Sequence, residues 1–78
     1  MDTERYVNLN SIERVKNFVN QIINIESDVD LIYGRYTLDA KSIMAIFSIN
    51  LNNKLKLVLH SDDEDEIRKF TEIAEEYK

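Results

Sequence analysis

Apolar side chains along this chain repeat every second residue in some segments and every third or fourth residue in others. The first spacing is typical of a strand with one buried face, and the second is typical of one face of a helix. The two spacings alternate along the chain and predict seven elements. Strands are expected at residues 5–9, 29–33, 36–39 and 54–61, and helices are expected to begin near residues 11, 42 and 61.

The predicted first helix has both a capping signal and an apolar stripe. Asn10 or Ser11 is a suitable N-cap, and Glu13 follows Asn10 at the spacing of a capping box. The stripe follows steps of three, four and three residues and consists of Ile12, Val15, Val19 and Ile22. Three further apolar residues widen it, namely Phe18, Ile23 and Ile25. We expect this stripe to form the buried face of the helix.

The middle of the chain predicts a hairpin followed by a short helix. The only glycine, Gly34, stands with Arg35 between two strand-like segments. Glycine at the first central position suits a two-residue turn of type II′, so the two strands are expected to pair antiparallel. The following residues, 40–48, are densely apolar, and Ser42 is a suitable N-cap for a helix of about two turns.

The last third of the chain predicts a strand and an amphipathic helix. Leu55, Leu57 and Leu59 share one face of the strand, and Ser61 with Glu64 has the spacing of a capping box. The helical stripe consists of Ile67, Phe70, Ala74 and Tyr77, and the acid-first pairs four residues apart are Glu64–Arg68 and Asp65–Lys69. Together the seven elements predict an α+β two-layer sandwich, in which residues 1–78 form one domain and the helices cover one face of the sheet.

Composition excludes several classes of function. The chain has 78 residues, no cysteine and a formal net charge of −5. Disulfides, zinc–thiolate sites and thiol chemistry therefore require residues that this sequence lacks. An acidic balance disfavours general binding to nucleic acid or to anionic membranes. With no signal-peptide pattern and no membrane-length apolar run, we expect a cytoplasmic protein.

Residues 28–44 resemble the central segment of HPr, the histidine-containing phosphocarrier of the bacterial sugar phosphotransferase system. Lys41-Ser42-Ile43-Met44 is similar to that family's signature around a regulatory serine, and it follows a hairpin at the family's distance. The resemblance extends to residue 77 without a gap, whereas the first 27 residues match in layout more than in identity. It implies the order βαββαβα, with a four-stranded, mainly antiparallel sheet whose second face is open.

The resemblance also implies where a phosphoacceptor should be. HPr proteins accept phosphate on a histidine at the start of the first helix, within a Gly-(Leu/Ile)-His-Ala-Arg-Pro-Ala stretch. The matching stretch here is residues 9–15, which places Ser11 at the histidine position and Glu13 at the arginine position. A serine without a base is a poor substitute for a neutral imidazole. A carboxylate at Glu13 would also repel a phosphoryl group.

Ser42 corresponds to the serine that a dedicated ATP-dependent kinase phosphorylates in many HPr proteins, with a role in carbon catabolite regulation. A phosphate at a helix N-terminus is favoured by free N–H groups and by the helix dipole. The resemblance implies a partner-binding surface beside it, formed by Ile43, Met44 and Phe47. The structural alternative is that Ser42 is only an N-cap and that Phe47 belongs to the core.

The single histidine and the acidic run of residues 62–66 have simple structural explanations. His60 lies near the end of the last predicted strand, opposite the leucine face, so we expect it to face solvent. The acidic residues favour the positive end of a helix dipole and lack the spacing of a calcium loop. We expect no metal site and no cofactor.

These observations lead to one primary hypothesis and two alternatives. The primary hypothesis is a bacterial, HPr-like protein, not an enzyme, that presents the Ser42 helix to protein partners as a regulatory or adaptor module. Expected partners are the HPr serine kinase, components of the phosphotransferase system or a transcriptional regulator. The first alternative is an unusual phosphocarrier that accepts phosphate from enzyme I. The second is an unrelated interaction module on the same fold.

Overall fold

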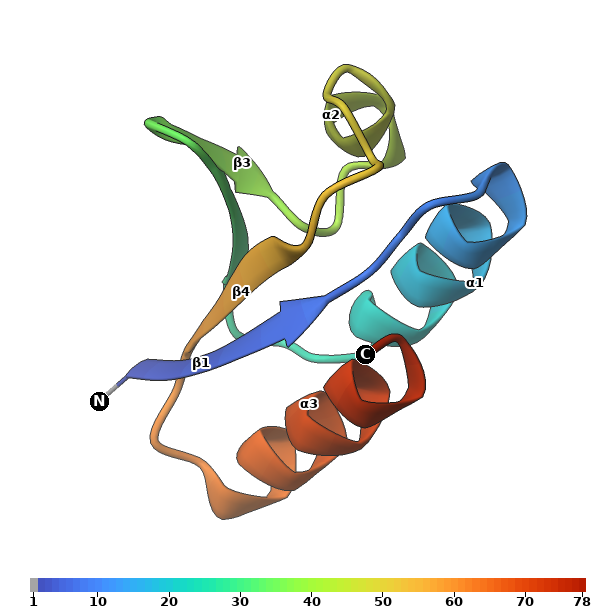
Figure 1. Ribbon diagram of the computed structural model, residues 1–78. Coiled ribbons are helices and arrows are strands. Elements are labelled where there is room, and N and C mark those ends of the chain that lie inside the picture. Colours follow the sequence, from blue (N-terminus) through green and yellow to red (C-terminus); the bar gives the residue numbers. More distant parts are fainter. Residues whose placement is uncertain (1) are drawn as a thin grey trace.

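Figure 1 shows the computed structural model, which describes residues 2–78, as a sheet with helices packed against one of its sides. The elements follow the predicted order βαββαβα. They are β1 (Asp2–Val7), α1 (Ile12–Ile22), β2 (Val29–Tyr33), β3 (Tyr36–Asp39), α2 (Ile43–Phe47), β4 (Leu55–His60) and α3 (Glu64–Glu76). The predicted α+β fold class is therefore confirmed.

The four strands have the order β1-β4-β2-β3, and each neighbouring pair is antiparallel. The strand β4 occupies a central position although it comes last in the sequence. Its pairing with β1 runs from Asp2 opposite His60 to Val7 opposite Leu55. Its pairing with β2 places Leu31 opposite Leu57. This register determines which side chains of distant segments share a face of the sheet.

A single apolar core lies between the sheet and the helices. Leu55, Leu57 and Leu59 of β4 are all buried, as the period-two pattern predicted. Phe18 of α1 packs edge-on against Tyr77 at the end of α3, with ring centroids 5.7 Å apart. Both layers contribute to this one cluster. That residues 1–78 form one domain stays a prediction.

The β2–β3 turn matches the glycine pattern in the sequence. Tyr33 pairs with Tyr36, which leaves Gly34 and Arg35 as a two-residue loop. Gly34 has a φ of +59°, and among residues 2–78 no non-glycine residue has a positive φ. This combination fits the predicted type II′ turn, in which only the first central residue is left-handed. A side chain at Gly34 would be strained by the backbone conformation rather than by neighbouring atoms.

Three predictions about apolar and strand positions were wrong in detail. The first strand is Asp2–Val7 rather than residues 5–9, because its alternation with β4 begins in the charged segment that pattern analysis discounts. Ile12 and Ile23 lie at the two ends of the first helix and are 64% and 58% exposed, instead of buried. A helix can bury an apolar stripe only where another element covers it, and these terminal turns extend past that cover.

The helix ends agree with the prediction in part. Ser11, one of the two predicted alternatives, is the N-cap of α1, whereas Asp63, not Ser61, is the N-cap of α3. Asp63 accepts bonds from two backbone N–H groups of the first turn, which a residue two positions earlier cannot reach. The helix α2 has five residues instead of about two turns. On α3, Arg68 pairs with Asp65 at 3.1 Å, three residues away rather than four.

Glu66 joins three segments at the start of α3. Its carboxylate accepts hydrogen bonds from the backbone N–H groups of Glu26 and Ser27, which precede β2. It also accepts bonds from the hydroxyls of Ser27 and Ser61. These bonds, first among them that from the Ser27 hydroxyl, lower the pKa of Glu66 from 4.5 to about 2. The ionised form of Glu66 therefore stabilises the connection between α3 and the loop before β2.

This arrangement predicts a specific loss of stability in acid. Because the pKa of Glu66 is lower in the folded state, its contribution is present above pH 4.5 and is lost as pH falls toward 2. We expect Glu66→Gln to lower the free energy of unfolding at pH 7 and to flatten its decline between pH 5 and pH 2. Urea unfolding at several pH values measures both quantities.

Glu64→Gln is the matched control, because it removes an exposed carboxylate from the same helical turn. Equal pH profiles for the two variants would contradict the assigned role of Glu66.

Candidate functional site

Ser11 is the N-cap of α1, and its side chain is occupied by that role. It has an extended backbone conformation, and its Oγ accepts a hydrogen bond of 3.1 Å from the backbone N–H of Arg14. Its carbonyl accepts the bond of 3.1 Å from Val15 that begins the helical ladder. In the described part of the chain, no side-chain base is hydrogen-bonded to the Ser11 hydroxyl. The geometry is that of a helix cap rather than an activated nucleophile.

The charged residues that follow Ser11 do not form a phosphate site. Glu13 is exposed in the first turn of α1, where a carboxylate favours the helix but opposes a second anion. Arg14 is engaged elsewhere, because its Nε donates a bond of 2.9 Å to the carbonyl of Asn8. Its guanidinium also lies over the Tyr77 ring, 5.3 Å from the centroid. The positive charge nearest to Ser11 in sequence therefore binds the C-terminal segment.

Ser42 is the N-cap of α2, which confirms its predicted capping role. Its Oγ accepts a bond of 3.3 Å from the backbone N–H of Ala45, and the side chain is half-buried. The segment before it is fixed by two further bonds. The Ser42 N–H donates to the carbonyl of Asp39, and the Lys41 N–H donates to the Asp39 carboxylate at 2.9 Å.

The five residues of α2 divide between the core and the solvent. Ile46 is completely buried, and Ile43 is half-buried against the core. Met44 is 77% exposed and Phe47 is 38% exposed, so both present apolar surface outward. Met44 is the most exposed of the three residues predicted as a partner surface, and the role of Ile43, Met44 and Phe47 in partner binding stays a prediction. In Figure 1 this helix stands at the edge of the molecule, close to α1, and the two helices are in contact.

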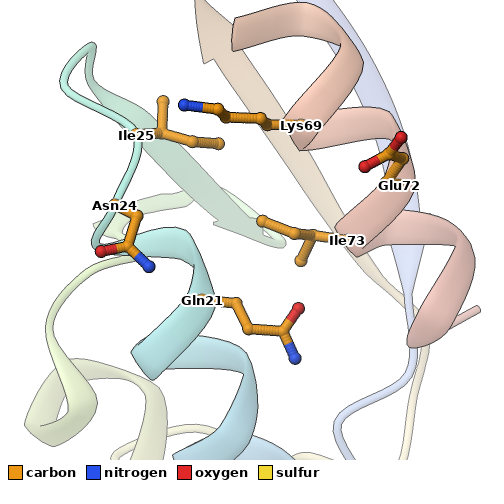
Figure 2. Close-up of a pocket in the computed structure, with 6 residues that line it drawn as sticks. All are labelled: Gln21, Asn24, Ile25, Lys69, Glu72 and Ile73. Carbon is orange, nitrogen blue, oxygen red and sulfur yellow. The ribbon is translucent and has the colours of Figure 1, made fainter.

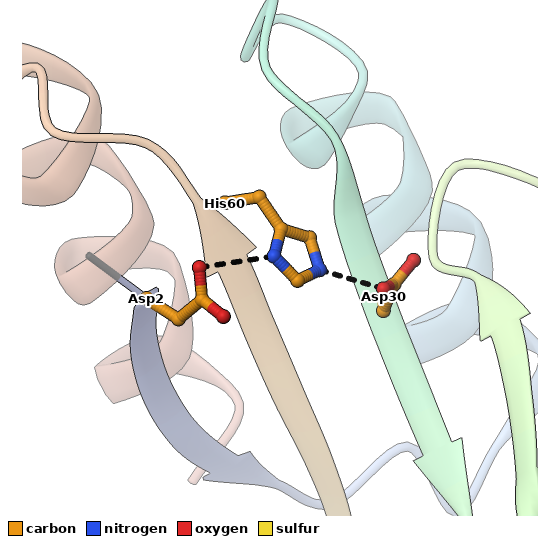
Figure 3. Close-up of polar contacts among 3 residues, drawn as sticks. All are labelled: Asp2, Asp30 and His60. Atoms are coloured by element: carbon orange, nitrogen blue, oxygen red, sulfur yellow. Dashed lines mark hydrogen bonds and ion pairs between the residues drawn. The ribbon is translucent and has the colours of Figure 1, made fainter.

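His60 lies at the end of β4 and points away from the leucine face, as predicted. Its two ring nitrogens contact two carboxylates (Figure 3). Nδ1 is 3.0 Å from Asp2 of β1, and Nε2 is 2.6 Å from Asp30 of β2. The strand β1 separates His60 from the segment that leads to Ser11. Six residues at about 3.3 Å per step place the two ends of β1 about 16 Å apart.

Sequence reasoning missed the partners of His60 and the exposure of Ile12. Asp2 and Asp30 are 58 and 30 residues from His60, and only the strand register brings them together. Ile12 directly follows Ser11 and adds an exposed apolar side chain at the start of α1. The sequence carries a signal for the contacts of His60, because strand alternation places Asp2, Asp30 and His60 on the open face of the sheet.

A metal cluster and a surface groove would be two further kinds of site. Within residues 2–78, no group of three or more His, Cys, Asp or Glu side chains is placed to hold a metal ion. A groove of about 380 Å³ lies between the end of α1 and α3 (Figure 2). Its walls combine amide, charged and apolar groups, from Gln21, Asn24, Ile25, Lys69, Glu72 and Ile73. None of the residues predicted for function contributes to it.

Comparison with known proteins identifies the family. A family model described as the HPr component phosphorylation site of the phosphotransferase system matches residues 13–77. The chain belongs to the HPr family. The match begins at Glu13, two residues after Ser11, so membership in the HPr family rests on the chain beyond the predicted acceptor position. No curated protein sequence matches the chain.

Solved HPr structures show the same fold. A phosphocarrier protein HPr from Bacillus anthracis has a TM-score of 0.74 and 18% identity, with 99% of this chain and 98% of that chain covered. An HPr-C-His protein from Thermoanaerobacter tengcongensis has a TM-score of 0.69 and 22% identity, with coverages of 94% and 91%. HPr proteins are phosphocarriers of the phosphotransferase system, not enzymes, and they interact with other proteins of that system.

The capping role of Ser11 leads to a quantitative prediction. Replacing an N-cap serine with alanine typically costs about 1 kcal/mol, whereas aspartate is as good a cap as serine. We expect Ser11→Ala to lower the free energy of unfolding by about this amount. Ser11→Asp is expected to keep the stability of the parent protein, and urea unfolding at pH 7 compares the three proteins. Equal stability of the alanine and aspartate variants would contradict the cap assignment.

Proposed function

We propose that this HPr family member is a regulatory or adaptor protein rather than a phosphohistidine carrier. In this proposal the helix α2 is presented to a protein partner, and phosphorylation of Ser42 controls that contact. The observation that carries the proposal is the combination of a capping Ser42 with the outward-facing Met44 and Phe47 on one short helix.

The surroundings of Ser11 argue against phosphotransfer at α1. A histidine carrier needs a nucleophilic imidazole and an anion-binding helix start. The only histidine of the chain is His60, and it lies at the opposite end of β1 between two carboxylates. Ser11 and Glu13 stand where the family resemblance places the histidine and the arginine. A phosphoryl group at this position would meet Glu13, while the Arg14 guanidinium is held by Asn8 and Tyr77.

The surface beside Ser42 favours a protein partner. An exposed methionine adapts its shape to different partners, and an adjacent aromatic residue adds rigid apolar area. A phosphate on Ser42 would stay near the N–H groups of the first turn, and the ammonium of the preceding residue, Lys41, donates a bond of 3.4 Å to the carbonyl of Glu26. The carboxylate of Asp39, three residues before Ser42, accepts a hydrogen bond from the backbone N–H of Lys41. A modified Ser42 would therefore change the charge of the partner surface without dissolving the short helix.

Two phosphorylation reactions separate this proposal from the carrier alternative. The purified chain is incubated with enzyme I and phosphoenolpyruvate, and separately with the HPr serine kinase and ATP. Intact mass and acid stability of the phosphate are then measured. We expect an acid-stable phosphate from the kinase reaction, lost in Ser42→Ala, and no acid-labile phosphate from enzyme I. Acid-labile label would establish the carrier alternative, and kinase labelling that survives Ser42→Ala would contradict the role of Ser42.

The partner surface is tested in the same kinase reaction. We expect Met44→Glu to reduce kcat/KM about tenfold, the change that corresponds to about 1.4 kcal/mol of lost contact energy. Ile23→Glu is the matched control. Like Met44, Ile23 is an exposed apolar side chain, but it lies at the end of α1. Equal losses in both variants would show that the surface beside Ser42 has no special role. The absence of any kinase labelling would favour the unrelated interaction module.

The remaining expectations follow from the family. HPr proteins are soluble and cytoplasmic, and we propose the same location for this chain. Among the described residues, no helix has the length and apolar character that a membrane crossing requires. Bacterial carbon catabolite regulation is the proposed context for the phosphorylation of Ser42. No role in nucleic-acid binding is proposed, because the net charge is −5.

A further inference from the structure

The open face of the sheet carries a charged arrangement that spans three strands. Asp2 lies on the edge strand β1, His60 on the central strand β4 and Asp30 on β2. Figure 3 shows the imidazole between the two carboxylates, with one bond toward each neighbouring strand. The His60 side chain is 39% exposed, and the two aspartates are 54% and 31% exposed. Solvent protons therefore reach the group directly.

The geometry requires a particular protonation state. An ionised carboxylate only accepts hydrogen bonds, so a bond to each ring nitrogen requires an N–H at both positions. A neutral imidazole has only one N–H. An imidazolium therefore satisfies both contacts, at 3.0 Å to Asp2 and 2.6 Å to Asp30, whereas a neutral ring satisfies one of them. After loss of the proton, one carboxylate would face a nitrogen lone pair, and the two aspartates would keep their negative charges across the ring.

We propose that Asp2, His60 and Asp30 form a pH-sensitive clamp that fastens the start of β1 to the sheet while His60 is protonated and releases it when His60 is neutral. The far end of β1 is anchored separately, because Val7 is buried and the Asn8 N–H donates a bond of 2.6 Å to the carbonyl of Tyr77. Release is therefore confined to the first residues of the strand.

Other charged and polar groups lie near His60 on this side of the sheet. On the same face, Asp39 of β3 stands opposite Asp30, and Glu4 of β1 pairs with Lys56 of β4 at 3.2 Å. The backbone N–H of His60 donates a bond of 3.0 Å to the backbone carbonyl of Asp28. The acidic residues of the segment after β4 begin at Asp62. The bonds to Asp30 and then Asp2 are the main reasons why the pKa of His60 is raised above 6.5.

The sign of the effect follows from linkage. A histidine whose pKa is higher in the folded state stabilises that state fully below its unfolded pKa of 6.5. This stabilisation is lost as pH rises through the folded pKa. The clamp therefore holds below pH 6.5 and opens as the pH rises through the raised pKa of His60.

The test uses the full chain, and its single histidine makes the signal unambiguous. The His60 ring is titrated by ¹H–¹⁵N NMR, and native-state hydrogen exchange of the backbone amides is measured at pH 6 and pH 8.5 after correction for intrinsic rates. We expect a pKa above 6.5 in the parent protein and a lower pKa in Asp2→Asn and Asp30→Asn. Glu75→Gln removes a carboxylate from the far end of α3 and is expected to leave the pKa unchanged.

Hydrogen exchange then links the titration to the movement of β1. Protection of the first β1 amides should be lower at pH 8.5 than at pH 6, by at most ten raised to the difference between the His60 pKa of the parent protein and that of Asp2→Asn, because Asp30 still holds His60 when β1 opens. Protection of the β2 amides should stay the same. In Asp2→Asn the amide side chain can donate or accept, so the pH dependence of β1 protection should disappear. A parent pKa at or below 6.5, or β1 protection that is equal at both pH values, would overturn the proposal.

Discussion

The central position of β4 is the constraint on which the other parts of this structure depend. It pairs with β1 on one side and with β2 on the other, so the register of β4 determines the register of most of the sheet. Its inner residues, Leu55, Leu57 and Leu59, form the floor on which α1 and α3 pack. Its outer residues face solvent or the charged groups of neighbouring strands. A shift by one residue would exchange the two faces and bury His60 in an apolar core.

The helix N-termini on this scaffold show how a shared fold is adapted. The two capping serines, Ser11 and Ser42, both have an extended backbone, and each accepts a bond from the backbone N–H three residues later. Their surroundings differ. An exposed apolar side chain follows both serines, but Ser11 is also followed by the carboxylate of Glu13 and by an Arg14 that binds the C-terminal segment. The contrast favours partner binding at α2 over phosphate acceptance at α1, because phosphate needs positive charge and free N–H groups.

The sequence predicted the order of elements, the antiparallel sheet and the hairpin at Gly34, because these depend on local periodicity and on one glycine with a positive φ. It predicted Ser11 as one of two caps and Ser42 as a cap for the same reason. It failed for Ile12 and Ile23, since periodicity identifies a face but not how far the neighbouring layer extends. It could not find the contacts of His60 or Glu66, which join segments 30 to 58 residues apart and depend on strand register and loop path.

We propose that this HPr family member keeps the fold of a phosphocarrier and has lost the phosphotransfer chemistry through two residues at the start of α1. A gain-of-function variant tests this claim most directly. Ser11→His combined with Glu13→Arg restores the residue types that the family resemblance implies, and Glu13→Arg alone is the control. After incubation with enzyme I and phosphoenolpyruvate, we expect acid-labile phosphate on the double variant only. Acid-labile phosphate on the parent protein would contradict it, as would a folded double variant that accepts none.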